Sequence, residues 1–154
     1  MKKSKDYAPY LFAFFITTIA SITNNVLFKS GNYTKKTKMK TGEGSFDVYE
    51  IKDFENNPAG YFMADPKNKL LVGDITVQSP KASTEKGIKI GDTFKDLLKA
   101  FPNIEVHGSE VEGRTYATAN NLSYRLNVPN FKYEVDKSKI PATTKIPEIV
   151  INRK

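Results

Sequence analysis

The stretch at residues 87–101, GIKIGDTFKDLLKAF, decides the fold because it carries the clearest helix signal in the chain. Its apolar side chains recur at helical spacing: Phe94, Leu97, Leu98 and Phe101. Either Asp92 or Thr93 can cap the N-terminus, and Asp96 can complete a capping box with Thr93. An apolar stripe on one side of a helix has to be buried against another element. We therefore predict a structural helix at residues 93–101 that packs on a sheet.

Short runs of alternating or β-branched residues on both sides of this helix predict strands. They lie at residues 46–51, 60–63, 70–77, 104–107, 114–119, 122–128, 131–135 and 149–151. Tight turns such as Asp65-Pro66-Lys67-Asn68 join the early runs, which is typical of an antiparallel meander. The fold class that follows is α+β, a mostly antiparallel sheet of about six to eight strands with one helix packed across it.

The N-terminus has the pattern of an export signal. Three early lysines precede an uncharged segment from residue 7 to residue 28, which includes the apolar run LFAFFI at residues 11–16. Small residues up to Ala20 fit a signal-peptidase site, so cleavage after Ala20 is one reading. The uncharged run is also long enough to span a bilayer as a helical anchor. Residues 1–28 are therefore predicted to be a signal peptide or a membrane anchor that places the rest of the chain outside the cytoplasm. A hydrophobic helix of a soluble protein is the third alternative.

The positive net charge lies in the N-terminal arm and not in the rest of the chain. The 154 residues carry a net charge of +7, but residues 41–154 hold 16 basic and 16 acidic side chains. Because a nucleic-acid-binding domain usually shows its charge excess on the folded domain, we expect no nucleic-acid partner. Residues 29–45 are predicted to be a lysine-rich linker before a single domain at residues 46–154. The linker lysines can also lie against anionic lipid headgroups: Lys35, Lys36, Lys38 and Lys40.

Patterns typical of catalysis and metal binding are scarce. The chain has no cysteine, which excludes disulfides, thiolate metal sites, cysteine nucleophiles and a lipidated N-terminal cysteine. The single histidine, His107, has no second histidine with which to share a zinc site, so we interpret it as structural. The acidic residues between positions 47 and 55 are interpreted as the solvated face of a strand. We predict no catalytic residue, no metal and no cofactor.

Two tyrosines on neighbouring predicted strands give the candidate ligand-binding site. Tyr116 and Tyr124 have Arg114 and Arg125 close to them in the sequence. Aromatic side chains with a polar tip, beside a guanidinium group, suit the recognition of a peptide, a glycan or an amphipathic ligand. The alternative is that these tyrosines fill the core or the rim of the sheet.

The runs KLLVGDITVQSP at residues 69–80 and GIKIGDTFKDLLKAF at residues 87–101 carry a family resemblance. The matching positions are Ile75, Val77, Gly87, Ile88, Gly91, Asp92 and Leu97. Over about residues 69–126, the chain resembles the C-terminal half of a small family of bacterial envelope lipoproteins of unknown function, under envelope-stress sigma-factor control. The chain departs from that family because it lacks the cysteine that is lipidated. The resemblance implies an envelope location and an α+β fold, and it brings no catalytic residues.

These observations favour a non-enzymatic, exported envelope module that binds a protein partner or a small amphipathic ligand. An accessory subunit of a membrane sensor is one form of this hypothesis. The alternative is a cell-wall-related hydrolase, or an inhibitor of a cell-wall enzyme, that works through an exposed loop at residues 106–113.

Overall fold

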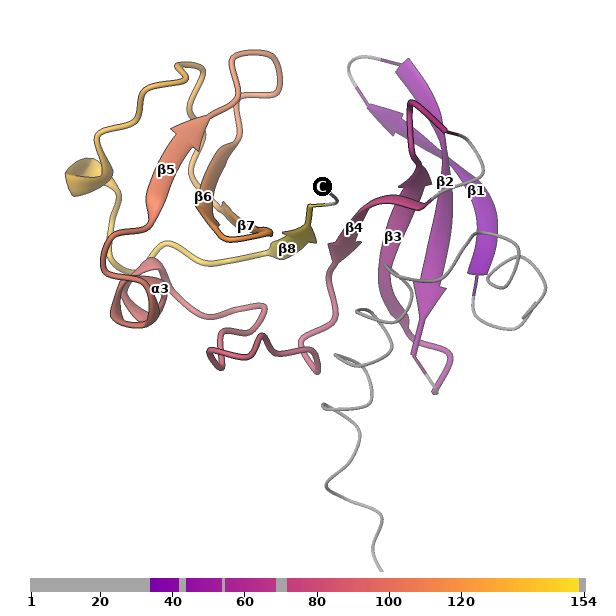
Figure 1. The fold of residues 1–154 in the computed structure, drawn as a ribbon, viewed down its shortest axis with the longest axis horizontal. Helices are drawn as coiled ribbons and strands as arrows, with labels where there is room; N and C mark the ends of the chain where they lie inside the picture. The colour runs from indigo at the N-terminus through magenta and orange to yellow at the C-terminus, as the bar shows by residue number, and fades with distance from the viewer. Residues whose placement is uncertain (1–33, 42–43, 54, 69–71, 153–154) are drawn as a thin grey trace, which may run out of the picture. The chain divides into compact units, whose positions relative to one another are not determined.

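The computed structural model describes residues 34–41, 44–53, 55–68 and 72–152 (Figure 1). The predicted signal peptide or anchor at residues 1–28 lies outside these ranges. No helix within the described ranges has the length and apolar character needed to cross a bilayer. The chain divides into two compact units between Ser79 and Pro80, an N-terminal unit and a C-terminal unit, and each is described by itself.

The N-terminal unit contains four antiparallel strands that pair in chain order, from indigo to magenta in Figure 1. They are β1 (Thr34–Thr41), β2 (Gly44–Lys52), β3 (Pro58–Ala64) and β4 (Val72–Val77). Asp65 forms the predicted turn before β4, because its Oδ1 accepts hydrogen bonds from the backbone N–H groups of Lys67 at 2.7 Å and Asn68 at 3.1 Å. The predicted meander is therefore confirmed in this unit.

Apolar side chains from β2, β3 and β4 are buried in the N-terminal unit. The buried residues include Val48, Ile51, Phe62, Val72 and Ile75. The Tyr49 ring stacks on Phe62 with a centroid distance of 5.0 Å. Strands β3 and β4 approach so closely at Gly60, with φ +154°, that an added Cβ would lie 2.0 Å from the Thr76 carbonyl oxygen. Only glycine fits there without moving the backbone.

The lysine-rich segment differs from the prediction. Residues 29–45 were expected to be a linker, but residues 34–41 form β1, which pairs along its whole length with β2. Its side chains alternate between exposed lysines and half-buried residues such as Thr37 and Met39, and this period of two is that of a strand. Lys36 and Lys38 form ion pairs with Asp47 at 2.9 and 2.5 Å. Hydrogen bonds from Lys38 and then Lys36 lower the pKa of Asp47 to about 2.

The C-terminal unit contains the other four strands and the helix. They are α3 (Phe94–Ala100), β5 (Glu105–Gly108), β6 (Thr115–Ala119), β7 (Leu122–Leu126), the 3₁₀ turn η1 (Lys137–Lys139) and β8 (Glu148–Ile151). Strands β5 to β8 pair in chain order, and every pair is antiparallel. With all the strand pairs antiparallel in both units, and α3 the one α-helix among the described residues, the predicted α+β class is confirmed.

The predicted capping box forms at the start of α3. The Thr93 side chain accepts a hydrogen bond from the backbone N–H of Asp96 at 3.3 Å, and the Asp96 carboxylate accepts one from the backbone N–H of Thr93 at 3.1 Å. The hydrogen bond to Thr93 lowers the pKa of the Asp96 carboxyl group. Two more first-turn N–H groups, those of Phe94 and Lys95, donate to backbone carbonyls of residues 144 and 142. The N-terminal donors that a helix leaves open are thus satisfied.

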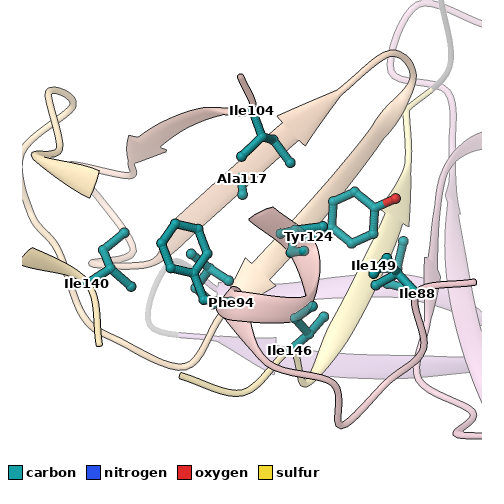
Figure 2. Packing of buried hydrophobic residues seen from close by; sticks show 10 residues of the cluster. Ile88, Phe94, Ile104, Ala117, Tyr124, Ile140, Ile146 and Ile149 are labelled. Carbon is teal, nitrogen blue, oxygen red and sulfur yellow. The ribbon is translucent and has the colours of Figure 1, made fainter. Parts of the chain in front are cut away.

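The apolar stripe of α3 enters the core of the C-terminal unit. Phe94 is buried there together with Tyr124 and Ile146 (Figure 2). Leu97 belongs to the same buried cluster. Leu98 and Phe101, also in the predicted stripe, pack against this cluster while staying partly exposed. The stripe therefore faces the sheet, as the sequence predicts.

One predicted strand is wrong. Residues 131–135 alternate like a strand, but they form only an isolated bridge between Glu134 and His107 of β5. Phe131 and Tyr133, which lie on the same side of this alternation, are 66% and 64% exposed. The segment lies against the edge of β5 without continuing as a ladder, and of its apolar residues only Val135 packs against the core. Alternation alone therefore predicted a strand that does not form.

Candidate functional site

The register of β6 and β7 decides which predicted site residues come together. Tyr116 pairs with Arg125, and Ala117 pairs with Tyr124. Directly paired residues share a face of the sheet, and successive residues alternate between faces. Tyr124 therefore lies on the face opposite to Tyr116, so the four predicted residues do not form one group.

Tyr124 belongs to the core and not to a binding surface. Its side chain has no solvent exposure and packs in the same cluster as Phe94 and Ile146 (Figure 2). Burial raises the pKa of its hydroxyl group, and a weaker interaction with the Thr84 side chain lowers this pKa. No hydrogen bond of acceptable geometry reaches the Tyr124 hydroxyl from the described residues. Tyr124 is therefore a core residue, which was the alternative to a binding role in the sequence analysis.

The other three predicted residues lie on the outer face of the strands. The Arg114 guanidinium group pairs with Glu112 at 3.3 Å, and Arg125 pairs with Glu148 at 3.4 Å. Interaction with the Tyr116 hydroxyl raises the pKa of Arg114. Burial raises the pKa of Tyr116, although Arg114 acts in the opposite direction. Each arginine is therefore held by a carboxylate, and the surface between them has little net charge.

Two further aromatic residues, which the sequence analysis did not assign to the site, join this face. The His107 ring stacks between Tyr116, at a centroid distance of 6.0 Å, and Tyr133, at 5.6 Å. The ring planes in these pairs are 26° and 29° apart. We call the set of His107, Arg114, Tyr116, Arg125 and Tyr133 the outer aromatic face. His107 of β5 pairs with Tyr116 of β6, and this pairing brings their two rings together. The pairing cannot be predicted from either residue alone.

The loop between β5 and β6 is fixed beside this face. Ser109 donates its N–H to the Arg114 carbonyl at 2.7 Å, and Gly113 donates to the Ser109 carbonyl at 2.8 Å. Val111, at the tip of the loop, is 71% exposed. This loop overlaps the 106–113 segment expected to work in an enzyme or inhibitor. Its ordered backbone and exposed apolar tip suit a contact surface.

A separate hollow of about 310 Å³ lies in the N-terminal unit. Its lining includes Lys38, Met39, Val48, Glu50, Lys52 and Tyr61. The charges in this lining have mixed signs, so they do not specify one ligand chemistry. Within the described part of the chain, no group of three or more histidine or acidic side chains is placed to hold a metal ion.

Comparison with known proteins places the fold but not the activity. Neither a scan against protein families nor a search of curated proteins found a match. Among solved structures, the chain is similar to the crystal structure of the uncharacterised protein YfeY from Escherichia coli, with a TM-score of 0.54 and 16% identity. The alignment covers 87% of this chain and 92% of that chain. At this identity the similarity shows a shared fold alone.

Proposed function

We propose that this chain is a non-catalytic, exported module of a bacterial envelope that binds a ligand or partner through the outer aromatic face. The observation that carries the proposal is the stacking of His107 between Tyr116 and Tyr133, beside two arginines that are already paired with carboxylates. Aromatic and arginine side chains that are fixed before binding lose little conformational entropy when a ligand arrives. The export signal predicted at residues 1–28 supports the envelope setting.

Affinity capture with the full chain tests the binding function. The chain, solubilised from its native membranes, is used to capture envelope components, which are identified by mass spectrometry. We expect one component to be retained by the parent and lost with Tyr133→Ala. Tyr61→Ala is the matched control, because Tyr61 is a partly exposed tyrosine in the hollow of the N-terminal unit. Capture that depends on Tyr61 and not on Tyr133 would place the binding surface elsewhere.

A captured membrane protein would make the chain an accessory subunit, as proposed from the sequence. Stable co-purification of the two chains in a fixed ratio is the expected result in that case. The enzyme alternative predicts turnover of a cell-wall substrate with ordinary saturation kinetics. Such turnover by the purified chain, abolished by a single substitution on the 106–113 loop, would replace the binding proposal.

The location is tested by sequencing the N-terminus of the mature protein. A new N-terminus after Ala20 indicates signal cleavage and release. An intact N-terminus in the membrane fraction indicates that residues 1–28 anchor the chain, with the lysines after them at the lipid surface. Recovery of the intact chain from the cytosol would contradict export.

A further inference from the structure

Phe131 is an exposed aromatic ring that rests directly on the backbone. An added Cβ at Gly113 would lie 2.3 Å from Cζ and 2.4 Å from Cε1 of Phe131, so the ring occupies the space of a side chain at Gly113. Gly113 also has φ +62°, a conformation that favours glycine. The ring is nevertheless 66% exposed. One side of Phe131 is therefore fixed on the chain while most of its surface meets solvent.

Backbone hydrogen bonds hold the whole segment that carries Phe131 and Tyr133. Asn130 donates its N–H to the Gly113 carbonyl at 2.9 Å, and the Asn130 side chain accepts from the N–H of Lys132 at 2.8 Å. The Tyr133 carbonyl accepts from Gly108 at 2.9 Å. Two large, exposed rings are thus presented on a fixed backbone. Rigid aromatic side chains of this kind give contact area at low entropic cost.

The charged pair next to Phe131 is neutral overall. Arg114 directly follows Gly113 in the chain and pairs with Glu112, and their side chains are 31% and 33% exposed. A guanidinium group that already holds a carboxylate is a weak site for a free anion, but the pair still offers donors and acceptors to hydroxyl groups. Aromatic surface together with a neutral donor–acceptor pair matches a ligand that has both C–H faces and hydroxyl groups.

The backbone arrangement disfavours an extended peptide at the same place. A peptide that adds as a strand needs a free strand edge. On β5 the outer edge is occupied by the segment with Tyr133 and Glu134, through the hydrogen bond from Gly108 and the bridge to His107. The ligand would therefore contact side chains and not a sheet edge.

We propose that Phe131 and Tyr133, with the Arg114–Glu112 pair, bind the pyranose rings of an uncharged saccharide. The rings contact the C–H faces of the sugar, and the paired guanidinium and carboxylate groups hydrogen-bond its hydroxyl groups. This inference rests on the proposed binding function and names the ligand class for the outer aromatic face, together with Phe131 and Glu112 beside it.

Calorimetric titration of the full chain tests this ligand class, in a detergent without a sugar headgroup. The probes are chitohexaose, which has the N-acetylated units of a cell-wall glycan, maltohexaose, which has plain glucose units, and an extended valine–threonine peptide. We expect one of the two saccharides to bind and the peptide to give no heat. Which saccharide binds distinguishes an N-acetylated glycan from a glucan.

Substitutions then connect binding to the two rings. Phe131→Ala and Tyr133→Ala should each weaken saccharide binding by about tenfold, the effect of losing one aromatic anchor. Gly113→Ala should also weaken saccharide binding, because the added methyl group would occupy the position of the Phe131 ring and displace it. Thermal melting checks that this variant keeps its fold. Phe46→Ala is the matched control, since Phe46 is an exposed phenylalanine of the N-terminal unit. The control should bind like the parent.

The two proposals can fail separately. If the affinity capture depends on Tyr133 but neither saccharide binds, the saccharide inference is overturned and the binding function stands. Saccharide binding that is unchanged in both Phe131→Ala and Tyr133→Ala also overturns the inference. If capture is independent of Tyr133 and neither saccharide binds, both proposals are overturned.

Discussion

Tyr116 and Tyr124 lie on neighbouring strands of one hairpin and have opposite surroundings. Tyr124 is fully buried against α3, whereas Tyr116 is half-buried on the outer aromatic face between His107 and the arginines. The difference arises from register, because Tyr116 faces Arg125 while Tyr124 faces Ala117. A change of one residue in a strand moves a side chain to the other face. Residue type therefore says less about a tyrosine's role than its place in the pairing.

The largest expected effect tests the buried side of this comparison. Leu97→Ala should lower the free energy of unfolding by about 2–5 kcal/mol, because it removes buried methyl groups and leaves a cavity beside the Tyr124 cluster. Lys95→Ala is the control on the exposed side of α3, and it should change stability by less than about 0.5 kcal/mol. Urea unfolding of the full chain measures both. A Leu97→Ala variant that unfolds like its parent would contradict the packing of α3 on the sheet.

A smaller effect distinguishes the two tyrosines directly. Tyr124→Phe should raise the free energy of unfolding by about 1 kcal/mol, because it removes a buried hydroxyl without a hydrogen-bond partner among the described residues. Tyr116→Phe should lower it by up to about 1 kcal/mol, because its hydroxyl interacts with Arg114. Thermal and urea unfolding give the signs. If both substitutions change stability in the same direction, the two hydroxyl groups have similar surroundings, and the comparison fails.

The smallest effect concerns the pH dependence of the helix cap. The pKa of Asp96 is lowered in the folded state, chiefly by the Thr93 side chain. Its contribution to stability is therefore complete above the model-peptide value of 3.8 and is lost as the pH falls through the lower folded value. The stability difference between the parent and Asp96→Asn should thus shrink as the pH is lowered below that value. A difference that stays constant down to strongly acidic pH would show that the carboxylate does not act as a cap.

Much of the fold follows from local patterns in the sequence. The helix could be predicted because a capping box and an apolar stripe agree on the same residues, Thr93 to Phe101. β1 was missed because its lysines suggested a solvated linker, although they alternate with residues that are half-buried. The segment at residues 131–135 was misassigned because alternation does not say which neighbour a chain lies against. Here Phe131 rests on Gly113, a contact between residues far apart in the sequence.

The candidate site was predicted only in part, because it depends on pairing. Arg114, Tyr116 and Arg125 share a face, but Tyr124 does not, and His107 and Tyr133 were not assigned to the site. A signal for the register was present in Asn120 and Asn121, which lie between the pair Ala119 and Leu122. Asn120 has φ +57°, as a tight hairpin turn requires. A two-residue turn fixes which strand positions face each other, and so places the two tyrosines on opposite faces.

The start of α3 depends on residues that are synthesised well after the helix itself. The N–H groups of Phe94 and Lys95 donate to the carbonyls of Thr144 and Ala142, and those of Gly91 and Ile146 bond across to Ile146 and Asp92. A growing chain that has reached β7 thus has no backbone acceptors for the first turn of its helix. Contacts between distant parts of a chain slow folding, since a long loop has to close first. We therefore expect the C-terminal unit to become stably ordered only after residues 142–146 have been synthesised, so a chain that has reached only β7 leaves this unit unfolded.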